Sequence, residues 1–324
     1  MMLDTLVIGA GWSGLTAASR LAAAGQQVLV LEKSRGPGGR SATRRDGKRQ
    51  FDHGAQYFTT RSAAFGRQLQ QWRDDGWIEK WTPRLAVLGG EAGHHDPETV
   101  QRFVALPGMN GVCRKLAEAV DCRFEARVER LARDAHWSAT LANGETIEAR
   151  SLLLTAPPKQ AAGLLGSDHP LHSTLDAVEF DPCFALMAAF GEALSPRFDA
   201  AFVNDDPVLS WIARDSSKPG RSGECWVAHA HGDWSRENLE RDPKVLEQAL
   251  VDALCRRLEL TESSPTAVQV HRWRYSQAIS PRDEGILVQE EQRLAVAGDW
   301  LSGSRVEGAW TSGRKAADWL AKVA

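Results

Sequence analysis

The sequence predicts an α/β protein, in which a Rossmann-like domain that binds a dinucleotide carries an inserted, second α+β domain. Two observations lead to this fold class. Elements typical of nucleotide binding occur near both ends of the 324-residue chain, and the residues between them are less regular. The chain has no internal repeat and no linker that would separate consecutive domains, and its length suits two domains of about 100–200 residues each. An insertion therefore explains the order of the elements better than two consecutive domains.

The opening of the chain has the pattern of a strand, a helix and a second strand. Residues 5–8 are apolar and β-branched, as in a strand buried on both faces. An alanine-rich stretch over residues 15–24 has helical periodicity and stops at Gly25, a residue type that commonly ends helices. Residues 27–31 form the second predicted strand, which is followed by Glu32.

A glycine-rich turn joins the first strand to the helix. Its sequence, Gly-Ala-Gly-Trp-Ser-Gly at residues 9–14, matches the G-x-G-x-x-G pattern of dinucleotide-binding proteins. Gly9 allows the tight turn, Gly11 lets the backbone approach a diphosphate, and Gly14 lets the helix pack closely on the strand. The Glu32 carboxylate lies at the distance along the chain where it can accept hydrogen bonds from ribose hydroxyls. A glycine-rich turn with an ordinary surface glutamate would explain fewer of these features.

A second loop brings further glycines and two arginines toward the same diphosphate. Residues 33–40 read Lys-Ser-Arg-Gly-Pro-Gly-Gly-Arg. The Glu32 carboxylate disfavours NADP, because it would repel a 2′-phosphate. A second phosphate-binding loop is also more than a simple NAD site needs. The alternative is a flexible basic loop without a ligand.

Further elements follow along the chain. We expect helices at residues 111–120, 244–258 and 306–323, and strands at residues 123–131, 145–155 and 293–297. Gly298-Asp299 follows the last strand, and Glu307-Gly308-Ala309 opens the last helix. A terminal amphipathic helix after a core strand would explain the apolar face of that helix, but not these two groups of residues together.

These motifs resemble those of the flavin-containing amine oxidase superfamily. The resemblance implies that the Gly38-Gly39-Arg40 segment wraps the diphosphate of FAD and that Asp299 holds its ribityl chain. It implies that the last helix directs its N-terminus at the N1–O2 edge of the flavin, where a reduced flavin carries negative charge. It also implies that Val128 offers its backbone to the adenine, and that the topology is that of amine oxidases and p-hydroxybenzoate hydroxylase.

Other segments resemble the bacterial renalase-like branch of this superfamily over essentially the whole chain. These segments are residues 51–59, 218–219, 234–235, 271–275, 298–300 and 305–310. The resemblance implies an FAD-dependent oxidase, with a dinucleotide and O2 as its small-molecule partners. Its substrates would be unproductive isomers of NAD(P)H, reduced at ring position 2 or 6, and its products NAD(P)+ and H2O2.

FAD is expected to be bound without a covalent link, because no cysteine follows Cys255. The FAD-binding domain is expected to comprise residues 1–62, 103–163 and 286–324, and the substrate domain residues 63–102 and 164–285. The expected cofactor-binding residues are Gly9, Gly11, Trp12, Ser13, Gly14, Glu32, Lys33, Gly39, Arg40, Ala55, Gln56, Val128, Gly298, Asp299, Val306, Glu307 and Ala309.

The expected substrate site is an aromatic wall rather than a nucleophile. Hydride transfer from an activated dihydropyridine needs stacking and orientation, and little acid–base chemistry. The expected residues are Gln56, Tyr57, Trp211, His229, Trp273 and Trp300. Gln56 is expected to bond a carboxamide or the flavin edge. The aromatic residues and His229 could equally belong to the core.

Composition argues against several other classes of function. Lys+Arg 39 against Asp+Glu 42 gives a net charge of −3, so no basic field favours nucleic acid or an anionic membrane. No apolar run reaches the ~18 residues that span a bilayer. An odd number of cysteines without a Cys-x-x-Cys pair, and an N-terminus without a leader, suit a cytoplasmic protein. The oligomeric state stays open, with a monomer favoured.

No metal site is expected. His94-His95-Asp96 offers ligand types, but it lies in a glycine-rich stretch typical of a polar loop. Two alternatives to the oxidase of dihydronicotinamides remain. One is an amine oxidase or desaturase of a small or apolar substrate, although no lysine lies between Lys244 and Lys315, where many amine oxidases have one near the flavin. The other is a non-catalytic FAD-bound binding protein.

Overall fold

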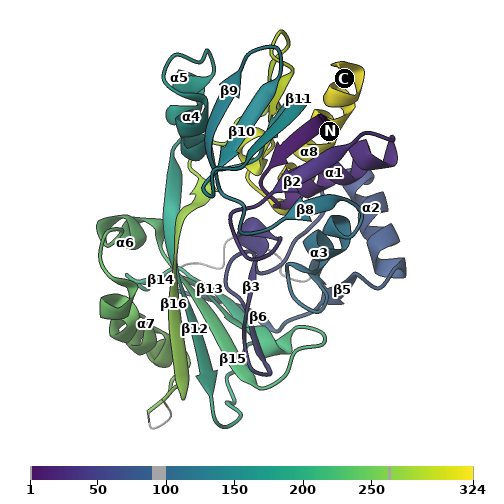
Figure 1. Cartoon of the computed structure of the whole chain (residues 1–324). Helices are drawn as coiled ribbons and strands as arrows, with labels where there is room; N and C mark the ends of the chain where they lie inside the picture. The colour runs from purple at the N-terminus through teal and green to yellow at the C-terminus, as the bar shows by residue number, and fades with distance from the viewer. Residues whose placement is uncertain (1, 90–99, 262–263, 324) are drawn as a thin grey trace. The chain divides into compact units, whose positions relative to one another are not determined.

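The computed structural model describes residues 2–89, 100–261 and 264–323, and its helices and strands are drawn in Figure 1. The chain forms two compact units. Unit 1 comprises Met1–Gly39, Val112–Glu179 and Ala278–Ala324, and unit 2 comprises Arg40–Gly111 and Phe180–Gln277. The predicted insertion is confirmed, because two stretches of unit 2 interrupt unit 1.

These unit boundaries differ from the expected domain boundaries at residues 62, 103, 163 and 286. The difference at the first boundary has a simple cause. Residues 49–52 form a strand that packs on a strand at residues 224–230 of unit 2. The backbone N–H of Asp52 also donates a hydrogen bond to Asp215 Oδ1, at 3.3 Å.

Unit 1 contains an eight-stranded sheet in the order β17-β18-β11-β1-β2-β8, with β10 and β9 added beside β11. Its strands are β1 (Leu3–Ile8), β2 (Val28–Leu31), β8 (Asp121–Arg123), β9 (Val128–Arg133), β10 (Trp137–Leu141), β11 (Thr146–Leu154), β17 (Leu287–Gln289) and β18 (Leu294–Val296). Its helices are α1 (Trp12–Ala23), α3 (Gly111–Ala117), α4 (Pro158–Leu165), α5 (His172–Asp176), α8 (Val306–Val323) and the 3-10 helix η3 (Asp299–Leu301).

The centre of this sheet is parallel, as a Rossmann-like domain requires. β1 pairs in parallel with β2 and with β11, and β11 pairs in parallel with β18. All four residues of β2 and the last four of β1 are buried, which explains their apolar, β-branched sequences. Helices α1 and α8 pack against each other, and Figure 1 shows them side by side. The predicted strand–helix–strand opening and the last strand and helix are therefore confirmed.

The predicted continuous strand over residues 123–131 is wrong. The chain forms β8, leaves the sheet, and begins β9 at Val128. Between these strands, Glu125 has φ +55°, in the left-handed region that strands exclude. The backbone N–H groups of Glu125 and Ala126 donate to the carbonyls of Ser34 and Glu32, at 3.0 and 2.9 Å. The alternating sequence gave no sign of the turn at Glu125 and Ala126, which lies beside the end of β2.

Unit 2 is built on a six-stranded sheet in the order β16-β12-β15-β14-β13-β6. Its strands are β6 (Leu85–Leu88), β12 (Phe180–Phe190), β13 (Ala200–Val203), β14 (Leu209–Arg214), β15 (Glu224–Ala230) and β16 (Ala267–Ala278). The remaining elements are β3 (Thr43–Asp46), β4 (Arg49–Asp52), β5 (Ile78–Trp81), β7 (Arg102–Ala105), α2 (Ala63–Asp74), α6 (Gly232–Glu237), α7 (Pro243–Arg257) and the 3-10 helices η1 (Gly39–Ser41) and η2 (Asp215–Ser217).

The two faces of the unit 2 sheet have different partners. On one face, Leu246, Leu250 and Leu254 of α7 pack into a core with Trp226 and Ile212 of the strands, and Figure 1 shows α7 beside this sheet. On the other face, Phe51 of β4 packs with Met187, Ala189, Cys225 and Val227. Because side chains alternate along a strand, Trp211 and His229 share the face that carries Phe51.

Candidate active site

The glycine-rich turn between β1 and α1 is open on the side that a ligand would approach. Gly9 has φ +109°, which favours glycine. A Cβ at Gly14 would clash with the carbonyl oxygen of Gly9, so only glycine packs there. A Cβ at Gly11, in contrast, would have no described atom within 4 Å. Among the described residues no side chain caps α1 at Gly11, so the helix N-terminus can receive an anion.

The second glycine loop lies against the first. The N–H of Gly38 donates to the carbonyl of Ala10 at 2.9 Å. Gly39 has φ +52°, and its Cβ would stand 3.6 Å from the Cα of Gly11. The two loops that the sequence predicts for one diphosphate are therefore neighbours in unit 1. Arg40 belongs to unit 2, where its guanidinium donates to the carbonyl of Ser276 at 3.0 Å.

The Glu32 carboxylate is fixed at the end of β2. Oε2 accepts a hydrogen bond from the N–H of Ala10 at 2.9 Å, and Oε1 accepts one from the N–H of Ser34 at 2.8 Å. Each carboxylate oxygen has a second lone pair, so Glu32 can still accept from ribose hydroxyls. Lys33, another expected cofactor-binding residue, donates from its ammonium to Gln160 Oε1 at 3.0 Å. Val128 begins β9 and is buried.

The two ends of the chain meet in unit 1. Ser13 Oγ, in the first turn of α1, donates to the carbonyl of Ala309 in the first turn of α8, at 2.9 Å. A Cβ at Gly313 would clash with the carbonyl of Ser13. Gly298 donates its N–H to Ser312 Oγ at 2.9 Å, and Asp299 beside it is buried. Of the remaining expected cofactor residues, Trp12 is buried in the first turn of α1, and Val306 and Glu307 are half-buried in the first turn of α8.

An aromatic row crosses the unit 2 sheet from strand to strand. We define it as Phe202, Trp211 and His229. Phe202 of β13 is paired with Trp211 of β14, and Trp211 is paired with His229 of β15. The ring centres of Phe202 and Trp211 are 4.8 Å apart, and Tyr57 lies 5.8 Å from Trp211. Three expected substrate residues, Tyr57, Trp211 and His229, are therefore neighbours.

A histidine cluster connects Trp273 to this row. The carbonyl of His53 accepts hydrogen bonds from His229 Nε2 at 3.2 Å and from Trp273 Nε1 at 2.9 Å. The His53 ring stacks on Trp273, with centres 5.1 Å apart, and meets His271 edge-on at 4.8 Å. Trp300 lies in unit 1, where it packs over Gly298. The structure thus groups Trp273 with Tyr57, Trp211 and His229, and Trp300 with the expected cofactor residues.

The imidazoles of this cluster are neutral at neutral pH. Burial lowers the pKa of His53 to about 3 and the pKa of His229 to about 4. Burial also lowers the pKa of His271 to about 4, and the Arg44 guanidinium adds to this effect. A neutral imidazole offers one donor and one acceptor, so the site carries no positive charge from its histidines.

Buried ions lie beside Gln56. Lys218 Nζ contacts Asp52 Oδ2 at 3.3 Å and also pairs with Asp215, and Arg221 pairs with Asp52. The side chains of Asp52, Asp215 and Lys218 are fully buried, and that of Arg221 is 1% exposed. We call these four residues the ion cluster.

The ion cluster holds Gln56. Gln56 Nε2 donates to the carbonyls of Asp52 and Gly54, and its Oε1 accepts from Lys218 Nζ at 3.4 Å. The carboxamide of this expected site residue is therefore oriented by unit 2 itself. Ala55, next to it, donates its N–H to the carbonyl of Arg40 at 2.9 Å.

The ion cluster and His53 were missed by reasoning from the sequence. Asp52 and Lys218 are 166 residues apart in the chain, and a lysine is rarely fully buried, so neither residue type nor spacing predicted the pair. The only local signal is Asp215-Ser-Ser-Lys218, which places opposite charges three residues apart.

The neutral histidines predict a loss of stability in acid. The unfolded chain protonates its histidines below about pH 6.5, whereas folded His53 and His229 resist protonation until about pH 3 and 4. Above pH 6.5 these histidines are neutral in both states, so they do not favour unfolding. As the pH falls from 6.5 toward 4, proton uptake by the unfolded chain progressively lowers the free energy of unfolding. We expect a loss of about 1–2 kcal/mol per buried histidine at pH 5, measured by urea unfolding at pH 7.5 and 5.0.

His229→Gln should reduce this pH dependence, because it removes one of the buried imidazoles. His136→Gln is the matched control, since His136 is exposed, and it should leave the pH dependence unchanged. An equal pH dependence in wild type and in His229→Gln would contradict the assignment of a neutral His229.

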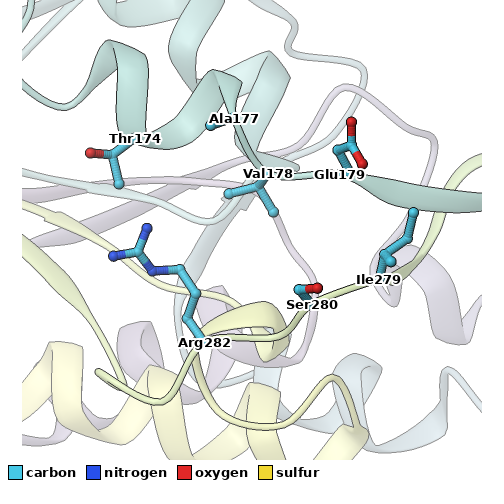
Figure 2. Close-up of a pocket in the computed structure, with 7 residues that line it drawn as sticks. All are labelled: Thr174, Ala177, Val178, Glu179, Ile279, Ser280 and Arg282. Carbon is cyan, nitrogen blue, oxygen red and sulfur yellow. The ribbon is translucent and has the colours of Figure 1, made fainter.

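Unit 1 also contains a pocket of about 300 Å³, drawn in Figure 2. Its lining residues are Thr174, Ala177, Val178, Glu179, Ile279, Ser280 and Arg282. None of them is an expected cofactor or substrate residue. No group of three potential metal ligands occurs among the residues that the structure describes, and His94-His95-Asp96 lies outside them. Within the described part of the chain, no helix is long and apolar enough to cross a membrane.

Two family models match the chain. A model described as NAD(P)-binding Rossmann-like domain matches residues 7–72. A model described as flavin containing amine oxidoreductase matches residues 81–320. The second match covers most of the chain and includes the aromatic row and residues 306–320 of α8.

Individual relatives agree with these matches over shorter stretches. An all-trans-retinol 13,14-reductase of Macaca fascicularis is 38% identical over 100 residues, covering 29% of this chain and 16% of the relative. A lycopene-forming phytoene desaturase of Pantoea ananas is 43% identical over 117 residues, covering 34% of this chain and 23% of the relative. The match thus spans less than a quarter of either relative's length. The solved structure of a putrescine oxidase mutant shares the fold, with a TM-score of 0.78 at 13% identity over 100% of both chains.

Proposed function

We propose that this chain, which belongs to the family of flavin-containing amine oxidoreductases, oxidises isomers of NAD(P)H that are reduced at position 2 or 6 of the nicotinamide ring. The family and the Rossmann-like domain make the chain an FAD-dependent oxidoreductase. In the proposed reaction, the dihydropyridine loses a hydride and becomes NAD(P)+. O2 receives the two electrons together with two protons, one of which comes from solvent, and becomes H2O2.

We propose that unit 1 holds FAD at those expected residues that belong to it, which lie in residues 9–39, at Val128 and in residues 298–309. The two adjoining glycine loops and the N-terminus of α1 suit its diphosphate, and the fixed Glu32 carboxylate suits a ribose. The first turn of α8 offers a second helix N-terminus, which stabilises negative charge. When bound, FAD supplies the two-electron redox chemistry. No cysteine follows Cys255, which supports non-covalent binding.

The observation that carries the proposed substrate is the aromatic character of the aromatic row, together with the neutral state of its His229. A dihydropyridine is flat and neutral, so it gains from stacking on Tyr57, Trp211 or Trp273. An alkylammonium would gain most from an unpaired carboxylate. In unit 2, however, the buried carboxylates of Asp52 and Asp215 already pair with Lys218 and Arg221. The site therefore favours a neutral ring over a cationic amine.

An amine oxidase or desaturase remains the second candidate, because the chain matches a phytoene desaturase and shares the fold of a putrescine oxidase. An apolar substrate would also fit an aromatic surface.

We propose a cytoplasmic location, which the five cysteines without disulfides support.

Anaerobic stopped-flow spectroscopy tests the proposed function. The purified protein is mixed with NADH isomers reduced at position 2 or 6, with ordinary NADH, and with amines such as putrescine. We expect the flavin absorbance to bleach rapidly with an isomer, slowly with NADH, and not with the amines. Admission of air should restore the absorbance and produce one H2O2 per isomer consumed. Rapid bleaching by an amine, with none by either isomer, would establish the second candidate instead.

A further inference from the structure

The indole N–H of Trp211 has no hydrogen-bond acceptor among the described residues, although the side chain is only 7% exposed. Trp300 of unit 1 shares this property among the described residues, but three other tryptophans of unit 2 differ. Trp81 Nε1 donates to Ser217 Oγ at 3.1 Å, Trp226 Nε1 to Glu224 Oε1 at 2.7 Å, and Trp273 Nε1 to the carbonyl of His53 at 2.9 Å. A buried donor without an acceptor is costly, because it loses its hydrogen bond to water.

The nearest described neighbours of Trp211 are aromatic rings. Phe202 and His229 flank it along the aromatic row. Tyr57, which is half-buried, lies 5.8 Å from Trp211 and 5.9 Å from Trp81. The Tyr57 ring therefore neighbours two indoles, and the Arg102 guanidinium lies 5.4 Å from its centre.

These features describe the ligand that would complete the site. An aromatic surface selects a flat ring, and the unpaired N–H of Trp211 selects a ring with an acceptor in its own plane. A saturated hydrocarbon would leave the N–H unpaired, and an alkylammonium, which has only donors, would place a donor against a donor. A nicotinamide ring carries a carboxamide oxygen in such a position.

We propose that Trp211 Nε1 donates a hydrogen bond to the carboxamide oxygen of the nicotinamide ring. Trp211 would thereby distinguish substrates that carry this carboxamide from those that do not. This inference rests on the proposed function and adds to it a residue that determines specificity. Together with stacking on the aromatic row, this hydrogen bond restricts the rotation of the ring in its plane. Trp211 thus selects which ring carbon is presented for hydride loss, while Tyr57 and the aromatic row bind the ring by stacking.

The test compares two ligands on two protein variants. Trp211→Phe keeps an aromatic ring beside Phe202 and removes the N–H. Trp81→Phe is the matched control, since it makes the same change to a tryptophan beside Tyr57 whose N–H is already bonded. Isothermal titration calorimetry of the FAD-loaded proteins measures the binding of the product NAD+ and of its thionicotinamide analogue, in which sulfur, a weak acceptor, replaces the carboxamide oxygen.

We expect Trp211→Phe to weaken the binding of NAD+ about tenfold and that of the thionicotinamide analogue about twofold or less. Trp81→Phe should change both affinities by the same factor. In turnover, Trp211→Phe should also lower kcat/KM for the preferred NADH isomer and reduce the preference between the 2- and 6-isomers.

The outcomes separate the inference from the proposed function. If the wild-type protein oxidises the isomers and Trp211→Phe weakens both ligands equally, the inference is wrong and the proposed function stands. If the wild-type protein neither oxidises an isomer nor binds NAD+, the proposed function fails and the inference fails with it. A selective loss for the carboxamide ligand in Trp211→Phe supports both.

Discussion

Gly11→Val should yield a folded protein that is purified without its FAD. Gly11 has extended backbone angles, φ −85° and ψ −175°, which valine adopts readily, and no described atom lies within 4 Å of its Cβ position. The added methyl groups would occupy the open space above the turn, where the diphosphate is proposed to lie against the N-terminus of α1. We expect affinity for FAD to fall roughly a hundredfold or more, the equivalent of about 3 kcal/mol.

The measurement is the flavin-to-protein absorbance ratio of the purified variant, followed by titration with added FAD. Circular dichroism and the unfolding of the flavin-free proteins show whether the fold is intact. Gly163→Val in α4 is the matched control, because Gly163 also has an open Cβ position but belongs to no expected ligand site. A yellow Gly11→Val protein with the wild-type content of FAD would show that the diphosphate does not lie on this turn.

Lys218→Met should destabilise the protein by about 3–5 kcal/mol, because it leaves two buried carboxylates with one cation. Asp52 keeps its pairing with Arg221 and its bonds from Thr43 Oγ1 at 2.6 Å and from the N–H of Met109 at 2.9 Å. Asp215 loses its main partner. Burial already raises the pKa of Asp215, and removal of Lys218 should raise it further.

The pH dependence of this effect follows from Asp215. Protonation neutralises the carboxylate that has lost its cation, so the destabilisation by Lys218→Met should be larger at pH 8 than at pH 5. Urea unfolding at the two pH values measures it. The double variant with Asp215→Asn should be more stable than Lys218→Met alone, since it removes the uncompensated charge.

The control for Lys218→Met is an exposed ion pair of unit 1. Arg20 and Asp318 are 45% and 53% exposed, and Asp318→Asn should cost less than about 1 kcal/mol. If Lys218→Met costs no more than this control, the ion cluster contributes little to the stability of unit 2.

Much of unit 1 could be predicted because its signals are local. The helix expected at residues 306–323 matches α8, Val306–Val323, and the glycine-rich turn sits between β1 and α1 as its pattern requires. Local periodicity and turn chemistry determine such elements. The strand expected at residues 123–131 failed for the same reason, since nothing in its alternation revealed the left-handed turn at Glu125.

The site in unit 2 could be predicted only in part. Aromatic residues were expected there because a flat substrate needs stacking, and the pairing of Trp211 with His229 brings two of them together. Their buried support depends on contacts between distant segments. Lys218 meets Asp52 across 166 residues, and His53 meets Trp273 across 220 residues. No short window of sequence contains such a pair, and a single sequence does not reveal it.

The meeting of the first turns of α1 and α8 has a consequence for biosynthesis. Ser13 and its partner Ala309 are 296 residues apart in the chain, so Ser13 leaves the ribosome well before Ala309. During synthesis, β1 and α1 therefore lack their neighbour α8 until residues 306–313 have been translated. A dinucleotide site built from both of these helix N-termini would therefore be completed only after residues 306–313 have been synthesised.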